Sequence, residues 1–215
     1  MRPYYDEDGI TIYHGDCREI LPGLEFDFMV VDPPFGISHA SNYTAPTTTA
    51  EWMNAEIDGD GDTSLRDFIL SHSDEWACFG SFKAPPPVGY RGVVVWDKGP
   101  ASGMGDLSFP WKLSWELVFI SGTLWRGFRD EGVIKWHHIV TRKSMGRVHP
   151  NEKPLGIMRH FIHKHPGGVM CDPCFGSGKS LEAAKLEGRR AIGIEIEERY
   201  CEIAAKRLAQ GVLFR

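Results

Sequence analysis

The chain has 215 residues, of which 42 % are hydrophobic and 25 % are charged, with a formal net charge of −5. These values fit one globular domain that buries its own core without metal or disulfide staples. No apolar run approaches the ~18 residues that a membrane helix needs, and the N-terminus lacks a signal-peptide pattern, so we expect a cytoplasmic protein that does not associate with membranes. Five cysteines suit a reducing compartment rather than a disulfide framework.

Short apolar runs alternate with helical patterns along the chain, which is typical of an α/β fold with a largely parallel sheet. The runs predict seven strands, at residues 10–14, 28–31, 77–79, 93–96, 117–120, 168–171 and 190–194. The helical patterns predict four helices, at residues 64–73, 153–165, 178–187 and 197–210.

Charge is distributed unevenly. Residues 1–75 hold 16 acidic and 3 basic side chains, whereas residues 122–165 hold 9 Lys and Arg, 3 acids and six histidines. Affinity for phosphate depends on such local basic patches rather than on net charge, so this stretch is the candidate surface for nucleic acid. A solvated basic face without a ligand is the alternative.

The first motif follows the buried strand 28–31 and reads Asp32-Pro33-Pro34-Phe35. Two consecutive prolines remove backbone donors and fix φ, so Asp32 and the Pro33 carbonyl form a stiff cluster of acceptors that suits an amino group. A base can reach such a cluster only when it is flipped out of the duplex, and Phe35 offers it a stacking face. Taken alone, the tetrapeptide is also compatible with a structural turn.

Residues 37–63 are polar and rich in turn-forming residues. Loops of this length in compact domains are usually functional or disordered, so we expect a mobile loop near the target base. Its acidic run, Asp58 to Asp62, lacks the further spaced ligands and the closing glutamate of an EF-hand, and we expect no metal there.

The second motif lies near the C-terminus, where the strand 168–171 leads through Asp172 to Gly176-Ser177-Gly178 and then a helix. Glycines at such a turn let the backbone approach a ligand at the helix N-terminus. The next strand ends at Glu195, about 20 positions after the glycines, where α/β folds place a carboxylate for ribose hydroxyls. The pattern therefore indicates a nucleoside ligand, although a turn made only for packing is the alternative.

Two glycines that other nucleotide-binding motifs require are missing here, which narrows the class of ligand. Pro173 stands where a phosphate-binding loop requires its first glycine, and Leu181 stands where the dinucleotide motif requires its third. A nucleoside without pyrophosphate remains, and S-adenosyl-L-methionine fits. Cys171 and Cys174 have no second pair to complete a zinc or redox site, so we interpret them as structural thiols.

Together the two motifs resemble those of the β class of amino-group DNA methyltransferases, in which the catalytic motif precedes the cofactor motif. Residues 149–154 resemble its His-Pro-x-x-Lys-Pro element, and residues 172–178 its Asp-Pro-Phe-x-Gly-Ser-Gly loop, with the phenylalanine displaced to position 175. Residues 12–17 resemble its Gly-Asp segment at a strand end. Residues 95–98 and 115–118 resemble further segments of the family.

The resemblance implies a single Rossmann-like methyltransferase domain over residues 1–215, with circularly permuted motif order. It implies a catalytic loop formed by Asp32, Pro33, Pro34 and Phe35. It implies that the cofactor is bound by Asp16, Cys17, Lys153, Asp172, Cys174, Phe175, Gly176, Ser177, Gly178 and Glu195. We expect DNA contacts in the basic region 122–150, from Arg126, Arg129, Lys135, Arg142, Lys143 and Arg147.

The resemblance further implies methyl transfer from S-adenosyl-L-methionine to the N6 amino group of a flipped adenine in double-stranded DNA, as in restriction-modification. A leading aspartate such as Asp32 usually accompanies adenine in this family, and a leading serine accompanies the N4 amine of cytosine. N4-cytosine methylation and an inactive DNA-binding relative are the alternatives. Because region 122–150 is shorter than the usual recognition domain, either the recognition site is short or relaxed or a second subunit of a homodimer contributes.

Overall fold

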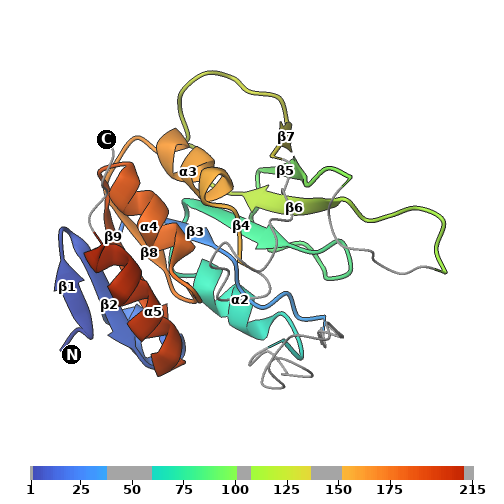
Figure 1. The fold of residues 1–215 in the computed structure, drawn as a ribbon. Coiled ribbons are helices and arrows are strands. Elements are labelled where there is room, and N and C mark those ends of the chain that lie inside the picture. The colour runs from blue at the N-terminus through green and yellow to red at the C-terminus, as the bar shows by residue number, and fades with distance from the viewer. Residues whose placement is uncertain (1, 38–59, 101–107, 137–151, 211–215) are drawn as a thin grey trace.

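The structure, a computed structural model, describes residues 2–37, 60–100, 108–136 and 152–210. In these residues nine strands form one sheet in the order β1-β2-β9-β8-β3-β4-β6-β5-β7 (Figure 1). The strands are β1 (Tyr5–Glu7), β2 (Ile10–His14), β3 (Phe28–Val31), β4 (Trp76–Gly80), β5 (Gly92–Asp97), β6 (Trp115–Ile120), β7 (Val133–Lys135), β8 (Val169–Asp172) and β9 (Arg190–Glu195). The helices are α1 (Cys17–Ile20), the 3₁₀ turn η1 (Leu21–Gly23), α2 (Ser64–Leu70), α3 (Leu155–Lys164), α4 (Lys179–Leu186) and α5 (Glu198–Ala209).

The predicted α/β fold is confirmed, and all seven predicted strands and four predicted helices are present. The sequence missed β1, β7, α1 and η1. Each of these spans only three or four residues, which is too short for hydrophobic periodicity to emerge. In the described part of the chain, no helix is both long enough and apolar enough to cross a bilayer.

Strand direction decides where each loop emerges. Strands β2, β9, β8, β3 and β4 are mutually parallel, so their carboxyl ends share one edge of the sheet, which we call the carboxyl edge. β6 runs antiparallel to both β4 and β5, with Gly80 opposite Leu117 and Ala77 opposite Ile120. The start of β6 therefore lies at the carboxyl edge, and its end lies at the opposite, amino edge.

Helices cover the sheet on both faces, and β3 shows how side chains alternate between them. Phe28 and Val30 pack in one apolar cluster with residues of α3, α4 and α5, which lie side by side (Figure 1). Met29 and Val31 pack in a second cluster with residues of α1 and α2. All four side chains of β3 are buried, as expected for a central parallel strand covered on both faces.

The centre of the sheet joins two segments that are far apart in sequence. β3 pairs in parallel with β8, with Met29 opposite Cys171, and the Val169 amide donates to the Asp27 carboxylate at 2.6 Å. This pairing brings the Asp-Pro-Pro-Phe loop and the glycine turn to neighbouring positions on the carboxyl edge. Ligands of open α/β sheets bind along this edge.

Gly193 provides a test of the packing behind the glycine turn. A Cβ atom on this buried β9 residue would lie 2.6 Å from both Leu181 Cδ1 and Phe175 Cδ1. We expect Gly193→Ala to lower the free energy of unfolding by about 1–3 kcal/mol, because a packed core resists added volume. Gly92→Ala in β5, where a Cβ meets nothing within 4 Å, is the control and should be neutral in urea denaturation. Equal loss in both variants would contradict this packing.

Candidate active site

The Asp-Pro-Pro-Phe loop begins where β3 ends, and its carboxylate is held by a lysine from another segment. Asp32 Oδ2 lies 2.8 Å from Nζ of Lys153, which stands two residues before α3. The other oxygen, Asp32 Oδ1, is buried and accepts no hydrogen bond from any described residue. A buried carboxylate oxygen is costly without a donor, so this atom points to a donor supplied by a ligand.

Lys153 belongs to a chain of alternating charges. Its Nζ lies 2.9 Å from Oε1 of Glu116 at the start of β6, and Oε2 of Glu116 lies 2.6 Å from Lys98 Nζ. Nζ of Lys153 also lies 5.5 Å from the ring centroid of Phe35 and 5.1 Å from that of Phe79. The lysine therefore links a carboxylate at each side and rests against the aromatic rings of the site.

Burial and pairing act in opposite directions on these groups. Burial raises the pKa of Asp32, and the nearby Lys153 only partly offsets it. Burial acts in the same sense on Glu116, but the charges of Lys153 and Lys98 outweigh it and lower its pKa. Burial would lower the pKa of Lys153, yet the two carboxylates raise it, so the lysine remains a cation.

The end of the loop is fixed by one member of the acidic run. The amide of Gly36 donates to Asp60 Oδ1 at 2.7 Å, and the amide of Ile37 donates to the same atom at 3.3 Å. Asp60 is buried, so its carboxylate orders the backbone that follows the Asp-Pro-Pro-Phe loop. Residues 38–59 of the predicted loop 37–63 lie outside the described residues. In the described ranges no three metal-ligating side chains are grouped to hold an ion.

The glycine turn between β8 and α4 adopts the backbone that its sequence predicts. Gly176 and Gly178 have φ values of +54° and +82°, a region that side-chain-bearing residues rarely adopt. A Cβ on Gly178 would lie 2.7 Å from Ala204 Cβ of α5, whereas a Cβ on Gly176 would meet nothing within 4 Å. Gly178 is thus required for packing, and the open space at Gly176 is available to a ligand.

Two further side chains of the turn have structural partners. The carboxylate of Asp172, at the end of β8, accepts from the Cys174 amide at 3.2 Å. Burial raises the pKa of Asp172 to about 7. The ring of Phe175 is buried in the apolar cluster beneath α3, α4 and α5, so it packs in the core of the domain.

The acidic residue that ends β9 supports the same turn. Glu195 Oε2 accepts from the Gly176 amide at 2.9 Å, and Oε1 accepts from the Glu197 amide at 2.9 Å. Its carbonyl accepts from the amide of Gly15, which joins the end of β2 to the end of β9. Asp16 then caps α1 by accepting from the Arg18 amide at 2.8 Å. Asp16 and Glu195 are therefore brought to adjacent strand ends.

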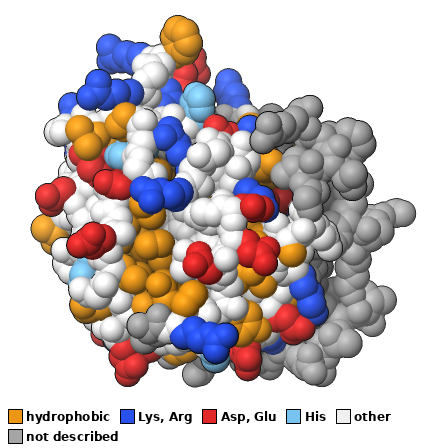
Figure 2. Space-filling view, turned by 90° about the vertical axis from the view of Figure 1, so that its left-hand side faces the viewer, with side chains coloured by type: hydrophobic (Ala, Val, Ile, Leu, Met, Phe, Trp, Pro, Cys, Tyr) orange, Lys and Arg blue, Asp and Glu red, His pale blue; other side chains and the backbone are white. Residues whose placement is uncertain are grey.

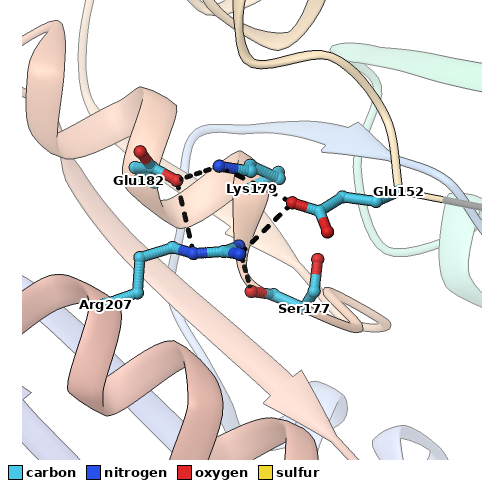
Figure 3. Close-up of polar contacts among 5 residues, drawn as sticks. All are labelled: Glu152, Ser177, Lys179, Glu182 and Arg207. Atoms are coloured by element: carbon cyan, nitrogen blue, oxygen red, sulfur yellow. Dashed lines mark hydrogen bonds and ion pairs between the residues drawn. The ribbon is translucent and has the colours of Figure 1, made fainter. Parts of the chain in front are cut away.

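A cluster of charged side chains from α4, α5 and the segment before α3 holds the backbone of the glycine turn (Figure 3). Arg207 of α5 donates to the carbonyl of Ser177 at 2.6 Å and lies 3.2 Å from Oε1 of Glu152. Lys179 and Glu182 of α4 pair at 2.7 Å and complete the group. Glu152 directly precedes Lys153, so two consecutive residues tie the glycine turn on one side and Asp32 on the other.

The predicted DNA contacts are divided by the sheet. Lys135 ends β7 opposite Asp97 and so lies at the carboxyl edge with Asp32. Arg126 and Arg129 are exposed, but they follow the end of β6, and the Arg126 amide donates to the carbonyl of Lys164 at the end of α3. The structure places these two arginines at the amino edge, away from Asp32. Residues Arg142, Lys143 and Arg147 lie outside the described residues.

The aromatic residue among these cations also has a packing role. Trp125 donates from Nε1 to the carbonyl of Ser121, and its ring meets those of Phe28 and His165 edge-on. The alternation of aromatic and basic residues in this stretch therefore arises in part from the core. The reversal of β6 explains why the beginning of the stretch lies at the amino edge.

Sequence reasoning also missed functional neighbours of Asp32. Lys98 and Glu116 were noticed only as parts of family-like segments, and Asp60 as part of an acidic run. Each became a candidate only when the fold placed it beside the Asp-Pro-Pro-Phe loop. Lys153 was predicted to contact a cofactor, whereas the structure pairs it with Asp32 and Glu116.

Comparison with known proteins gives consistent matches over nearly the whole chain. Residues 111–206 match the family model N6_N4_Mtase, described as DNA methylase. The type II methyltransferase M2.DpnII of Streptococcus pneumoniae is 37 % identical, with 96 % of this chain and 92 % of that protein covered. M2.LlaDCHI of Lactococcus lactis subsp. cremoris is 24 % identical, with 99 % and 94 % covered.

Solved structures show the same fold. The PvuII DNA methyltransferase (cytosine-N4-specific) aligns with a TM-score of 0.68 and 15 % identity, covering 99 % of this chain and 91 % of that one. M1.HpyAVI in complex with SAM aligns with a TM-score of 0.60 and 20 % identity, covering 92 % and 99 %. The Rossmann-like prediction is confirmed by both.

Asp172 should make stability depend on pH. Its carboxyl has a usual pKa of 3.8, and burial raises this to about 7, so between these values the folded state keeps a proton that the unfolded state loses. The free energy of unfolding therefore falls as pH rises from about 4 to 7. In the Asp172→Asn variant, the free energy of unfolding should fall less over this pH range than in the wild type, as measured by urea denaturation at several pH values. An unchanged difference between the two proteins across this range would contradict the assignment.

Proposed function

Because the chain belongs to the amino-group DNA methyltransferase family, we propose that it transfers a methyl group from S-adenosyl-L-methionine to the N6 amino group of adenine in DNA. One observation carries the proposal: Asp32 Oδ1 is buried beside the glycine turn without a donor among the described residues. An amino group is a donor of the required kind, and this acceptor lies at the edge where the cofactor turn also ends.

The glycine turn and its neighbours fit the cofactor. The open space at Gly176 admits the ligand, and Ser177 and Gly178 complete the backbone that would surround it. Glu195 and Asp16, at adjacent strand ends, would receive the ribose and the adenine, since both offer carboxylate acceptors to hydroxyl and amino groups. When bound, S-adenosyl-L-methionine supplies an electrophilic methyl group on a sulfonium sulfur.

Asp32 and its partners activate the target nitrogen. Its Oδ1 accepts one N–H of the amine, and the Pro33 carbonyl accepts the other, which favours a pyramidal nitrogen whose lone pair is free to attack the methyl carbon in line. On transfer, the C–S electron pair would stay on sulfur, and Asp32 or solvent would take the proton that the nitrogen releases. Lys153 fixes Asp32 through Oδ2, so the structure favours a role for Lys153 in orienting the carboxylate.

Adenine is favoured over cytosine by the leading aspartate of the motif. Both bases present an exocyclic amine whose N–H could donate a hydrogen bond to Asp32. The PvuII enzyme, which has a similar fold, is cytosine-N4-specific, so the fold does not distinguish the two bases. Transfer from labelled cofactor to unmethylated genomic DNA, followed by digestion and nucleoside analysis, distinguishes them. N6-methyldeoxyadenosine is expected, and N4-methyldeoxycytidine alone would replace the adenine assignment. If no methyl group were transferred under conditions where the cofactor binds, the assignment as a methyltransferase would be contradicted.

Removal of the acceptor should abolish transfer selectively. We expect Asp32→Ala to lower kcat by about 100-fold or more, the scale of losing a preorganised polar contact in a transition state. The Kd for cofactor, measured by calorimetry, should stay within about threefold, because other residues are assigned to that ligand. A variant with near wild-type kcat would remove Asp32 from the catalytic role.

The cluster behind the glycine turn should support cofactor affinity. Glu152→Gln weakens the hold on Arg207, which positions the Ser177 carbonyl, so we expect the cofactor Kd to rise about fivefold, equivalent to ~1 kcal/mol. Glu187→Gln is the matched control, since Glu187 joins α4 to α3 through Arg159 and His163 away from the turn. If both variants bound cofactor like wild type, the cluster would have no part in cofactor binding.

A further inference from the structure

Two aromatic side chains meet at the carboxyl edge beside the site. Phe82 follows β4 and Trp115 begins β6, and the register of Gly80 opposite Leu117 brings these two ends together. Their ring centroids lie 5.5 Å apart. Phe82 keeps 53 % of its surface exposed.

A second aromatic pair lies on the segment that leads into β6. The rings of Phe109 and Trp111 lie 5.4 Å apart, and the two side chains are 58 % and 71 % exposed. In Figure 1 this segment, residues 108–114, extends away from the sheet and its helices. Large apolar side chains exposed together mark an interaction surface. We call residues 108–115 with Phe82 and Lys83 the aromatic arm.

The arm is joined directly to the catalytic carboxylate. Trp115 is followed by Glu116, whose Oε1 shares Nζ of Lys153 with Asp32. No residue therefore separates the arm from the ion-pair chain of the candidate active site. The base of the arm, at Trp115, therefore lies beside the ion-pair chain that holds Asp32, and residues 108–114 extend outward from there.

The charge of the arm suits a polyanion. Lys83 and Lys112 are exposed, and residues 80–83 and 108–115 contain no acidic side chain. By contrast, Figure 2 shows basic and acidic side chains intermixed on the face that it presents, the left-hand side of Figure 1. Arg126 and Arg129 lie at the amino edge. The arm combines exposed aromatic surface with positive charge, and it begins beside Glu116 of the ion-pair chain.

We infer that the aromatic arm is a surface on which DNA bases stack next to the target base. The inference rests on the proposed function, because a flipped base leaves its neighbours without a stacking partner. Exposed aromatic faces replace that partner for any base, and lysines contact the adjoining phosphates. The arm thus offers DNA a surface at the carboxyl edge, whereas Arg126 and Arg129 lie at the amino edge.

Matched variants at the two edges test this inference. Trp111→Ala should raise the Kd for a 30-base-pair duplex of random sequence by about tenfold, the scale of one lost base–aromatic contact. The cofactor Kd should not change. Phe128→Ala, which removes a 93 % exposed ring beside Arg129 at the amino edge, should leave DNA affinity unchanged. Lys112→Gln should reduce the slope of log Kd against log salt concentration by about one.

The outcomes separate this inference from the proposed function. If wild type methylates DNA but Trp111→Ala binds DNA equally well, the arm is not a DNA surface while the enzyme assignment stands. If Trp111→Ala instead turns a dimer into a monomer in light scattering with unchanged DNA affinity, a second copy occupies the arm and the inference fails. If only Phe128→Ala weakens DNA binding, the DNA surface lies at the amino edge.

Discussion

The ion pair between Asp32 and Lys153 connects segments that meet at the carboxyl edge from distant parts of the chain. Taking two charges out of water is costly, and that cost is recovered only when geometry and further partners are good. Glu116 supplies the further partner, and Lys98 balances Glu116 in turn. The start of β6 and the segment before α3 are thereby fixed relative to the Asp-Pro-Pro-Phe loop.

The same segment extends this connection to the cofactor side. Glu152 and Lys153 are adjacent, yet one faces the cluster around Arg207 and the other faces Asp32. The pairing of β3 with β8 supplies the second link between the two motifs, through the backbone of the sheet. Segments separated by about 140 residues therefore meet both through strand pairing and through two consecutive side chains.

The sequence was most informative where the chemistry is local. Strand, turn and helix follow one another at residues 168–187, so the glycine turn could be placed, and Gly176 and Gly178 adopt the expected backbone. Partners that meet across the sheet could not be placed in this way. Glu116 reaches the site only because β6 runs against β4, a direction that no local pattern encodes.

That antiparallel strand also explains why Arg126 and Arg129 lie at the opposite edge from Asp32. A basic stretch indicates attraction for phosphate but not where the stretch lies on the fold, and its first residues follow the end of β6 at the amino edge. Phe175 shows a similar limit, because its place in a motif gave no sign that its ring packs in the core against Gly193.

Reversal of a single strand has a consequence for how such enzymes could acquire new recognition sites. Residues inserted between β5 and β6 emerge at the carboxyl edge. Even a short insertion there is within reach of a base beside Asp32. Residues added after Ile120 start a full strand length away, roughly 20 Å for six residues, and must return across the sheet before touching the same DNA. A compact member of the family is therefore best diversified by grafting at the first of these junctions.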